Sequence, residues 1–357
     1  MGTYRVVQWS TGGVGAIAVG AIAERPDLDL VGVWVHDPTK AGRDAGVVTG
    51  RAPIGVLTSA DAHALLALAP DCVCYSAPGE ARPHEVVDDF CRMLSAGCNI
   101  VTTSMPALLW PLSLPEAQLA RLTEACDKGN ATLYGTGIEP GFAGDHLVLV
   151  LATMSRRIEH VRTQEIFSYS DYPVAFTMFE VFGFGKSMDH ECIMELPGVQ
   201  TGAWGPAIHL VAAQLGVELD GLRETYDKRV TDRALHVAAG RIDAGTVGAV
   251  RFETIGVVDG RDAIVIEHVN RMAPDLAPDW PRAARDGTYR VTVHGEPDLT
   301  CELQLGGPTD FSHHGMVATT MRAVNAIPSV CRAPAGIVGA ADIPLTLPVH
   351  AFDPGSS

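Results

Sequence analysis

The fold is decided by a stretch near the start of the chain, Arg5-Val6-Val7-Gln8-Trp9-Ser10-Thr11-Gly12-Gly13-Val14-Gly15. Its first five residues have the pattern of an apolar strand, and a helix of small residues follows over 16–24. A second apolar run covers 28–35. Strand, glycine-rich turn, helix and strand make a βαβ unit, which begins a parallel sheet.

The turn of this unit has the spacing of G-x-G-x-x-G, with Ser10 in the first place. In such a turn Gly12 lets the backbone approach a pyrophosphate and Gly15 lets the helix lie close to the strand, while helix N–H groups face the phosphates. The alternative is a turn that only packs a helix on a strand. The strand before it, the helix after it and an acidic residue about 20 positions later favour a dinucleotide site. We therefore predict cofactor contacts from Ser10, Thr11, Gly12, Gly13, Val14 and Gly15.

The end of the second strand bears on the choice of cofactor. His36 and Asp37 follow the apolar run, and Lys40 and Arg43 come just after them. Asp37 can accept a hydrogen bond from a ribose 2′-OH, which favours NAD. Lys40 and Arg43 can hold a 2′-phosphate, which favours NADP, unless they belong to a solvated loop. We expect NADP rather than NAD, or use of both.

Strand and helix patterns continue to alternate after this unit. Apolar strands are expected at 71–78, 98–103 and 131–135, with helices at 85–96 and 114–128 between them. Near-continuous apolar strands of this kind form a parallel sheet covered on both faces. A Rossmann-type domain over 1–143 follows, and further cofactor contacts are expected at its strand ends, from Ser76, Ala77, Pro78, Thr102, Thr103 and Glu139.

The pattern changes in the second half of the chain. Polar and apolar residues alternate over 157–170, 247–258, 263–272 and 288–305, and Asp259-Gly260 is a hairpin signal. The predicted fold class is α/β: a Rossmann-type parallel sheet domain plus an α+β substrate and dimerisation domain with an open, largely antiparallel sheet. The second domain covers 144–310, and 311–345, with a helix at 311–327, returns to the first. The end, 353–357, is expected to be frayed.

Composition excludes several classes of function. With 26 Lys+Arg against 42 Asp+Glu the formal charge is −16, which disfavours nucleic acid and membrane surfaces as partners. There is no secretory leader pattern and no apolar run of the ~18 residues that span a bilayer. The eight cysteines include no CxxC pair, so we expect free thiols, a cytoplasmic location and no metal site.

Three stretches resemble one family. They are the opening run 6–15, the strand Asn99-Ile100-Val101-Thr102-Thr103, and the turn Gly135-Thr136-Gly137-Ile138-Glu139-Pro140-Gly141-Phe142. Together they resemble dihydrodipicolinate reductase-like NAD(P)-binding proteins, and within these the group of 2,4-diaminopentanoate dehydrogenase and the native amine dehydrogenases. The resemblance implies hydride transfer to a carbonyl or imine carbon of a small, partly apolar substrate, and association as a homodimer or homotetramer.

Two departures from the family limit the inference about chemistry. The His-His-x-x-Lys type run of the dihydrodipicolinate reductases is absent, because the one adjacent pair, His313-His314, lacks the Lys. The acidic residue that the amine dehydrogenases carry after the fifth strand is also absent, since this chain has Ser104-Met105-Pro106. Lysine biosynthesis is therefore disfavoured, and another residue is needed as proton donor.

Glu139 is the first candidate for that donor. It stands where the resemblance places an Asn in a G-x-N-P-G-F turn, after the last Rossmann strand; orienting the nicotinamide amide or capping a helix is the alternative role. Tyr169 and Tyr172 are further catalytic candidates at a strand end. The substrate candidates are Met105, Phe142, Phe176, Phe179, Phe182 and Lys186, of which the four from 176 onward lie in a stretch that reads either as a glycine-hinged lid or as a core helix with a turn. His268 and Arg271 are expected on a solvated or interface face.

Three functions remain open from the sequence. The leading one is an NAD(P)H-dependent reductase or dehydrogenase that acts on a carbonyl or imine carbon. The second is its amine-forming version, in which ammonia and a ketone are the substrates. The third is a catalytically inactive NAD(P)-binding sensor.

Overall fold

The computed structural model describes residues 2–79, 82–306, 310–349 and 351–352. The chain forms two compact units, Met1–Ile138 with Met316–Ser357, and Glu139–Gly315. The sequence placed these divisions after 143 and after 310. The expected frayed end at 353–357 lies outside the described residues.

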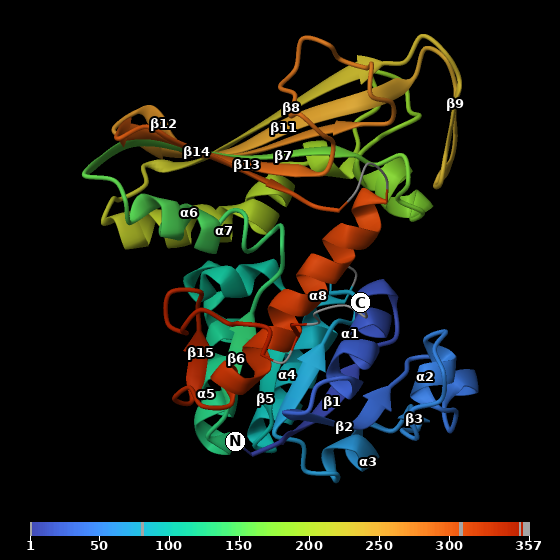
Figure 1. The fold of residues 1–357 in the computed structure, drawn as a ribbon. Coiled ribbons are helices and arrows are strands. Elements are labelled where there is room, and N and C mark those ends of the chain that lie inside the picture. The colour runs from blue at the N-terminus through green and yellow to red at the C-terminus, as the bar shows by residue number, and fades with distance from the viewer. Residues whose placement is uncertain (1, 80–81, 307–309, 350, 353–357) are drawn as a thin grey trace. The chain divides into compact units, whose positions relative to one another are not determined.

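The first unit contains the predicted parallel sheet (Figure 1). Its strand order is β15-β6-β5-β4-β1-β2-β3, and every neighbouring pair is parallel. The strands are β1 (Tyr4–Trp9), β2 (Leu28–Trp34), β3 (Thr58–Ser59), β4 (Cys72–Tyr75), β5 (Asn99–Thr102), β6 (Thr132–Gly135) and β15 (Gly336–Val338). Strand order reverses at β1, so the carboxyl ends of β1 and β4 flank the position where such folds bind ligands.

Helices cover both faces of this sheet. Apolar residues of α1 (Gly13–Ala23) and α8 (Phe311–Val330) form one core with the strands. Those of α3 (Ala62–Leu66), α4 (Pro83–Ser95) and α5 (Glu116–Gly129) form the other. The short elements are α2 (Ala45–Val48), η1 (Pro38–Lys40), η2 (Pro106–Leu109) and η3 (Pro111–Ser113).

The second unit is built on a six-stranded sheet of order β14-β13-β7-β12-β11-β8. Its strands are β7 (Arg157–Ser168), β8 (Gly221–Val230), β11 (Val247–Val258), β12 (Arg261–Arg271), β13 (Thr288–Glu296) and β14 (Leu299–Gln304). Only the β7–β12 pair is parallel, and the β11–β12 hairpin turns at Asp259 and Gly260, both with positive φ. The largely antiparallel sheet and the hairpin are thus confirmed.

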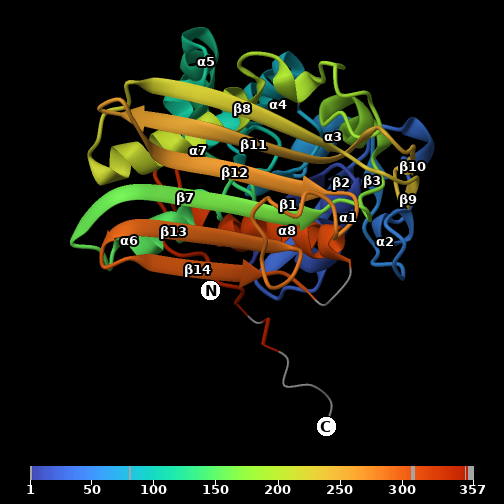
Figure 2. The same ribbon diagram turned by 90° about the horizontal axis from the view of Figure 1, so that it is seen from above.

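Helices α6 (His146–Ala152) and α7 (Val199–Leu215) pack on one face of this sheet, as Figure 2 shows from the opposite face. The remaining elements are a π-helix, η4 (Phe176–Val181), a short helix, η5 (Ile193–Glu195), and a hairpin of β9 (Leu235–Val237) and β10 (Gly240–Ile242). None of the described helices is long and apolar enough to cross a membrane.

Candidate cofactor and catalytic sites

Gly12 and Gly15 of the β1–α1 turn are glycines for different structural reasons. A Cβ added to Gly15 would lie closer to the Ser10 carbonyl oxygen than the 3.0 Å that real Cβ atoms respect, and 3.1 Å from Ser76 Oγ. A Cβ added to Gly12 would meet only Ser10 Oγ, at 3.8 Å. Gly15 therefore serves the close approach of helix and strand, whereas the space beside Gly12 is open.

The start of α1 fits the pyrophosphate of a dinucleotide. Gly12 is the N-cap residue, and no side chain among the described residues caps the helix, so the first N–H groups of α1 can donate to an anion. Helix α8 packs against the same turn: Thr320 Oγ1 donates to Val14 O at 3.3 Å, and a Cβ on Gly13 would lie 2.8 Å from Met316 Sδ. Helix α8 thus supports the turn on one side. Ser10, Thr11 and Gly12 are at least partly exposed.

The loop after β2 carries the residues that were expected to determine the preference for NAD or NADP. Asp37 is exposed and caps η1, accepting from Thr39 N at 2.9 Å and Thr39 Oγ1 at 2.8 Å. These bonds, with the nearby charges of Lys40 and His36, lower the pKa of Asp37. No described carboxylate forms an ion pair with Lys40 or Arg43. Asp37 and Arg43 are exposed in this loop, and Lys40 is half-buried.

The loops after β4 and β5 lie against each other. A Cβ on Gly79 would collide with the carbonyl oxygen of Ser104. Among the residues predicted to touch the cofactor here, Pro78 is exposed, Ser76 and Thr103 are half-buried, and Ala77 and Thr102 are buried. Thr102 Oγ1 accepts from Ser104 N at 3.0 Å. Met105, a predicted substrate residue, packs on the apolar core of the first unit.

In the second unit the carboxylate of Glu139 is deeply buried. Both of its oxygens are buried, and neither makes a hydrogen bond of normal geometry within the described residues. Burial raises the pKa of Glu139 well above its ordinary value, and the charges of Glu165 and Asp145 raise it further. The indole N–H of Trp204 and the N–H of Gly144 are near enough to oppose this rise. A pKa raised in this way extends the pH range over which the carboxyl keeps its proton, as a general acid requires.

Glu165 on β7 is the second buried carboxylate of this cluster. It accepts from Tyr169 Oη at 2.6 Å and from Asn270 Nδ2 at 3.2 Å. Burial raises the pKa of Glu165, while the hydroxyls of Tyr169 and Tyr289 and the amide of Asn270 lower it. Asn270 Oδ1 is buried without a partner among the described residues. The structure therefore brings Tyr169 and Glu139 to one polar cluster.

The other catalytic candidate, Tyr172, lies beside Tyr169, with ring centroids 5.9 Å apart. It is half-buried.

His268 and Arg271 were expected on a solvated or interface face, and the solvated alternative is wrong because both are buried. His268 is 2% exposed; its ring stacks on Phe252 and meets Trp204 at a tilt, with ring centroids 4.5 Å apart in both cases. Burial lowers the pKa of His268 to about 3, which keeps it neutral. Arg271 is also 2% exposed and donates to the backbone carbonyls of the loop after β12. Alternation in β12 identified a strand but not which of its faces other segments of the chain cover.

Trp204 and Glu165 belong to the polar cluster and were not singled out by the sequence. Trp204 sits inside α7, where an apolar helix pattern is typical of core. Glu165 lies in an alternating strand, where a carboxylate normally faces water. Neither residue belongs to a motif, so only the tertiary structure assembles them.

The stretch 176–190 is a π-helix followed by glycine turns. Phe182 is buried in the second unit, Phe179 is half-buried and Phe176 is exposed. Gly183 and Gly185 both have positive φ, as a hinge or a turn requires. Lys186 Nζ forms an ion pair with Glu180 at 2.6 Å. Phe142, near the start of the unit, is half-buried and stacks near His146, with centroids 6.3 Å apart.

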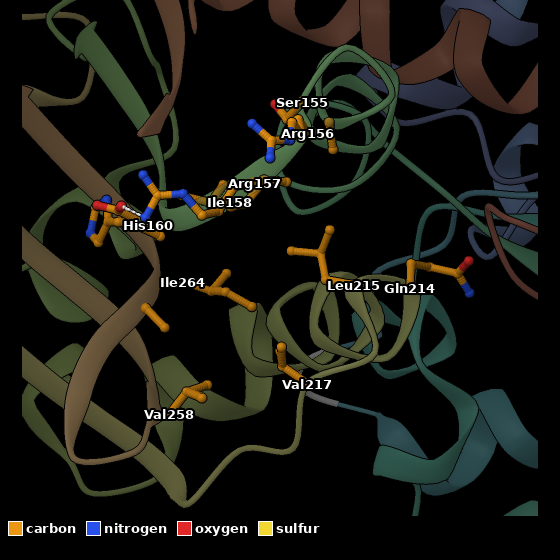
Figure 3. Close-up of a pocket in the computed structure, with 14 residues that line it drawn as sticks. Ser155, Arg156, Arg157, Ile158, His160, Gln214, Leu215, Val217, Val258 and Ile264 are labelled. Atoms are coloured by element: carbon orange, nitrogen blue, oxygen red, sulfur yellow. Dashed lines mark ion pairs between the residues drawn. The ribbon is translucent and has the colours of Figure 1, made fainter. Parts of the chain in front are cut away.

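A separate cavity of about 400 Å³ lies elsewhere in the second unit (Figure 3). It is lined by residues of the α6–β7 junction, such as Ser155 and His160, and by the end of α7, including Leu215. None of the predicted site residues lines it. The described residues contain no group of His, Cys, Asp and Glu that could hold a metal ion.

Comparisons with known proteins place the chain in a family. Residues 142–352 match the 2,4-diaminopentanoate dehydrogenase C-terminal domain family. An amine dehydrogenase of Streptomyces virginiae is 38% identical over 345 residues, which cover 95% of this chain and 96% of that protein. The 2,4-diaminopentanoate dehydrogenase of Acetoanaerobium sticklandii is 24% identical over 69% of this chain and 66% of its own length.

The fold is also found among solved structures. The amine dehydrogenase of Mycobacterium smegmatis has a TM-score of 0.74 at 21% identity, covering 96% of this chain and 97% of that chain. The glycine turn, the parallel sheet and these relatives define an NAD(P)-dependent oxidoreductase that uses a nicotinamide cofactor. The chain belongs to the family of 2,4-diaminopentanoate dehydrogenase and the amine dehydrogenases.

Proposed function

We propose that this oxidoreductase is an amine dehydrogenase, which forms a primary amine from a small, partly apolar ketone and ammonia at the expense of NAD(P)H. The observation that carries the proposal is Glu139, whose buried carboxylate has no hydrogen-bond partner in the described residues and whose pKa lies well above the ordinary value. The 38% identity to the Streptomyces virginiae amine dehydrogenase supports the reaction type.

Glu139 is suited to work as an acid in this reaction. Three residues separate it from the end of β6, and ligands of such sheets bind beyond the carboxyl ends of the strands. Attack of ammonia on the ketone gives a carbinolamine, whose hydroxyl leaves as water when Glu139 donates a proton to it. The nicotinamide, when bound, supplies hydride to the resulting iminium carbon. Each turnover consumes one hydride and one proton and releases one water.

Glu139 also compensates for a family residue that this chain lacks. Ser104 stands after β5, where the resemblance places an acidic residue. A carboxyl at 139 provides the same proton at a neighbouring strand end. The proposal therefore makes Glu139 the general acid, with Tyr169 and Glu165 placed beside it.

NAD(P)H oxidation with a panel of small ketones, with and without ammonia, tests this proposal. Oxidation that requires ammonia and yields a primary amine supports it. Ammonia-independent oxidation to an alcohol identifies a carbonyl reductase instead. Tight cofactor binding without turnover of any ketone or imine identifies a sensor.

We propose NADP as the preferred cofactor. Lys40 and Arg43 have no described carboxylate partner in an ion pair, and two free cations beside the ribose suit a 2′-phosphate. Asp37 is engaged in capping η1, although it keeps acceptor capacity for a 2′-OH in NAD.

We also propose a homodimer that associates through the face of the second sheet opposite α6 and α7. Glu267 on that face is fully buried and forms ion pairs with Arg162 at 2.5 Å and Arg251 at 2.7 Å. Such an ordered polar network gives a rigid surface for a second copy. Light scattering at micromolar concentration tests this, and a monomer would refute it.

All eight cysteines are free, which suits the reducing cytoplasm that we propose as its location.

A further inference from the structure

Gln8 is a polar side chain near the carboxyl end of β1, a buried parallel strand. It is fully buried, and its neighbours in the register are Val33 on β2 and Cys74 on β4. A buried amide loses its hydration, which costs free energy wherever hydrogen bonds do not replace the lost water. Here Nε2 finds partners, whereas Oε1 is buried without one among the described residues. The residues on either side of it in β1 are apolar and buried, Val7 before it and Trp9 after it. The amide therefore needs a specific reason.

The hydrogen bonds of Gln8 give that reason. Its Nε2 donates to Ser76 Oγ at 2.8 Å and to the carbonyl oxygens of Trp9 and Ser10, both at 3.2 Å. An inverted amide would place its own oxygen against two carbonyl oxygens, so the orientation is fixed by its partners. The partners are the two loops that leave β1 and β4, and both loops contain predicted cofactor contacts.

The backbone of Ser10 is strained and needs hydrogen bonds that hold it in place. Its φ is +91°, in a region that residues other than glycine rarely adopt. Its carbonyl oxygen lies under Gly15, where no Cβ fits. If Ser10 relaxed to negative φ, this carbonyl would turn and the approach of α1 to β1 would change. The Gln8 amide binds the carbonyl in its present direction.

We propose that Gln8 is a positioning residue of the cofactor site, which holds the Ser10 carbonyl and Ser76 in place so that the start of α1 is presented to the pyrophosphate. It touches no cofactor atom and acts through Ser10. This explains how Ser replaces the first glycine of the G-x-G-x-x-G turn without loss of the turn.

The test is titration of the purified full-length chain with NADPH and with NADH, followed by calorimetry. Gln8→Met keeps the volume and removes the donor, and we expect the Kd to rise about tenfold, the scale of a lost buried hydrogen bond. Gln8→Asn, which keeps an amide but shortens its reach, is the second variant and is expected to weaken binding similarly. Thr132→Val is the matched control, because Thr132 Oγ1 is buried and donates to Pro334 O at 2.8 Å at the other end of the sheet.

Combination with Ser10→Gly separates positioning from general destabilisation. Glycine adopts positive φ without strain, so the loss caused by Gln8→Met is expected to shrink to about threefold when it is measured against the Ser10→Gly single variant. This rescue, with an unchanged Kd in Thr132→Val, supports the proposal. An unchanged Kd in folded Gln8→Met and Gln8→Asn overturns it. So does an equal loss in both Ser10 backgrounds, or an equal loss in Thr132→Val.

Discussion

The Tyr169 hydroxyl donates a 2.6 Å hydrogen bond to the buried carboxylate of Glu165. This bond and that of Asn270 Nδ2, at 3.2 Å, compensate the burial of an acid that is 5% exposed. A hydroxyl held in this way contributes first to stability, and its proton is committed to Glu165. The sequence predicted a catalytic role for Tyr169. Removing the hydroxyl distinguishes that role from a stabilising one.

Tyr169→Phe is expected to lower the free energy of unfolding by about 1–3 kcal/mol, the cost of leaving a buried acceptor unsatisfied. Turnover is expected to fall less than about tenfold, because the hydroxyl is already engaged. Urea unfolding and steady-state kinetics of the same preparation measure both quantities. Tyr226→Phe, which loses a 2.7 Å bond to Phe182 O, is the control for a hydroxyl bonded to a neutral acceptor. A hundredfold loss of turnover at unchanged stability would instead make Tyr169 a proton donor.

Two glycines of the phosphate turn are expected to respond in opposite ways. Gly12→Val should leave the unfolding temperature nearly unchanged, since the space beside Gly12 is open and its φ of −69° suits any residue. It should raise the cofactor Kd more than about tenfold, or ~1.4 kcal/mol, because the side chain would occupy the place that we propose for the pyrophosphate. Gly15→Ala should destabilise the first unit by about 1–3 kcal/mol through collision with Ser10. Unaltered affinity in Gly12→Val would contradict the assignment of the turn.

Cofactor preference is expected to depend on two side chains. The double substitution Lys40→Ala with Arg43→Ala should raise the Kd of NADPH about tenfold or more and leave that of NADH within about twofold, because only NADPH carries the 2′-phosphate. Asp37→Ser is the matched control: it keeps a capping oxygen for η1 and removes the charge, so NADPH should bind at least as tightly. If the wild-type chain prefers NADH and the double substitution changes nothing, the proposed NADP preference is wrong.

The sequence predicted the helices and strands more completely than the residues that pack against them in the tertiary structure. The strand–turn–helix at 5–24 depends on local pattern and on glycine spacing, so its position and the parallel sheet follow directly. The hairpin at Asp259-Gly260 is likewise local chemistry. The burial of His268 does not follow from local pattern, because Trp204 lies 64 residues earlier (268 − 204), in α7, which packs on one face of β12.

The candidate site also has one part that the sequence predicts and one part that only the tertiary structure assembles. The cofactor turn is contained in six consecutive residues, and a short motif describes it. The cluster around Glu139 gathers Glu165, Tyr169 and Asn270 from separate strands and loops, and no spacing in the sequence connects them. Gln8 could have been noticed as a polar residue in an apolar strand, but its role depends on the φ of Ser10, which sequence does not report.

The raised pKa of Glu139 predicts how stability depends on pH. Because the folded chain keeps this proton above the ordinary value of 4.5, the folded state binds more protons than the unfolded state between 4.5 and the folded pKa. Stability then falls as pH rises through that interval. Glu139→Gln removes the contribution, so the unfolding temperature of the variant relative to wild type should increase from pH 5 to pH 8. Thermal unfolding at several pH values measures it, and a difference that stays constant would show an ordinary carboxyl.

The same substitution decides the role of Glu139 in turnover. Glu139→Gln keeps the size of the side chain and one acceptor, so the cofactor Kd should not change. The rate of reductive amination should fall about 100-fold or more, the usual scale for loss of a general acid. In the wild-type chain the rate should also fall as pH rises through the raised pKa of Glu139, and this limb of the pH profile should be absent from the variant's residual activity. A purely orienting role leads to the opposite result, because Gln is closer to the Asn that the family turn carries and would leave turnover nearly intact. A variant with full activity and an unchanged pH profile would therefore remove Glu139 from the mechanism and leave Tyr172 and Lys186 as the groups to substitute next.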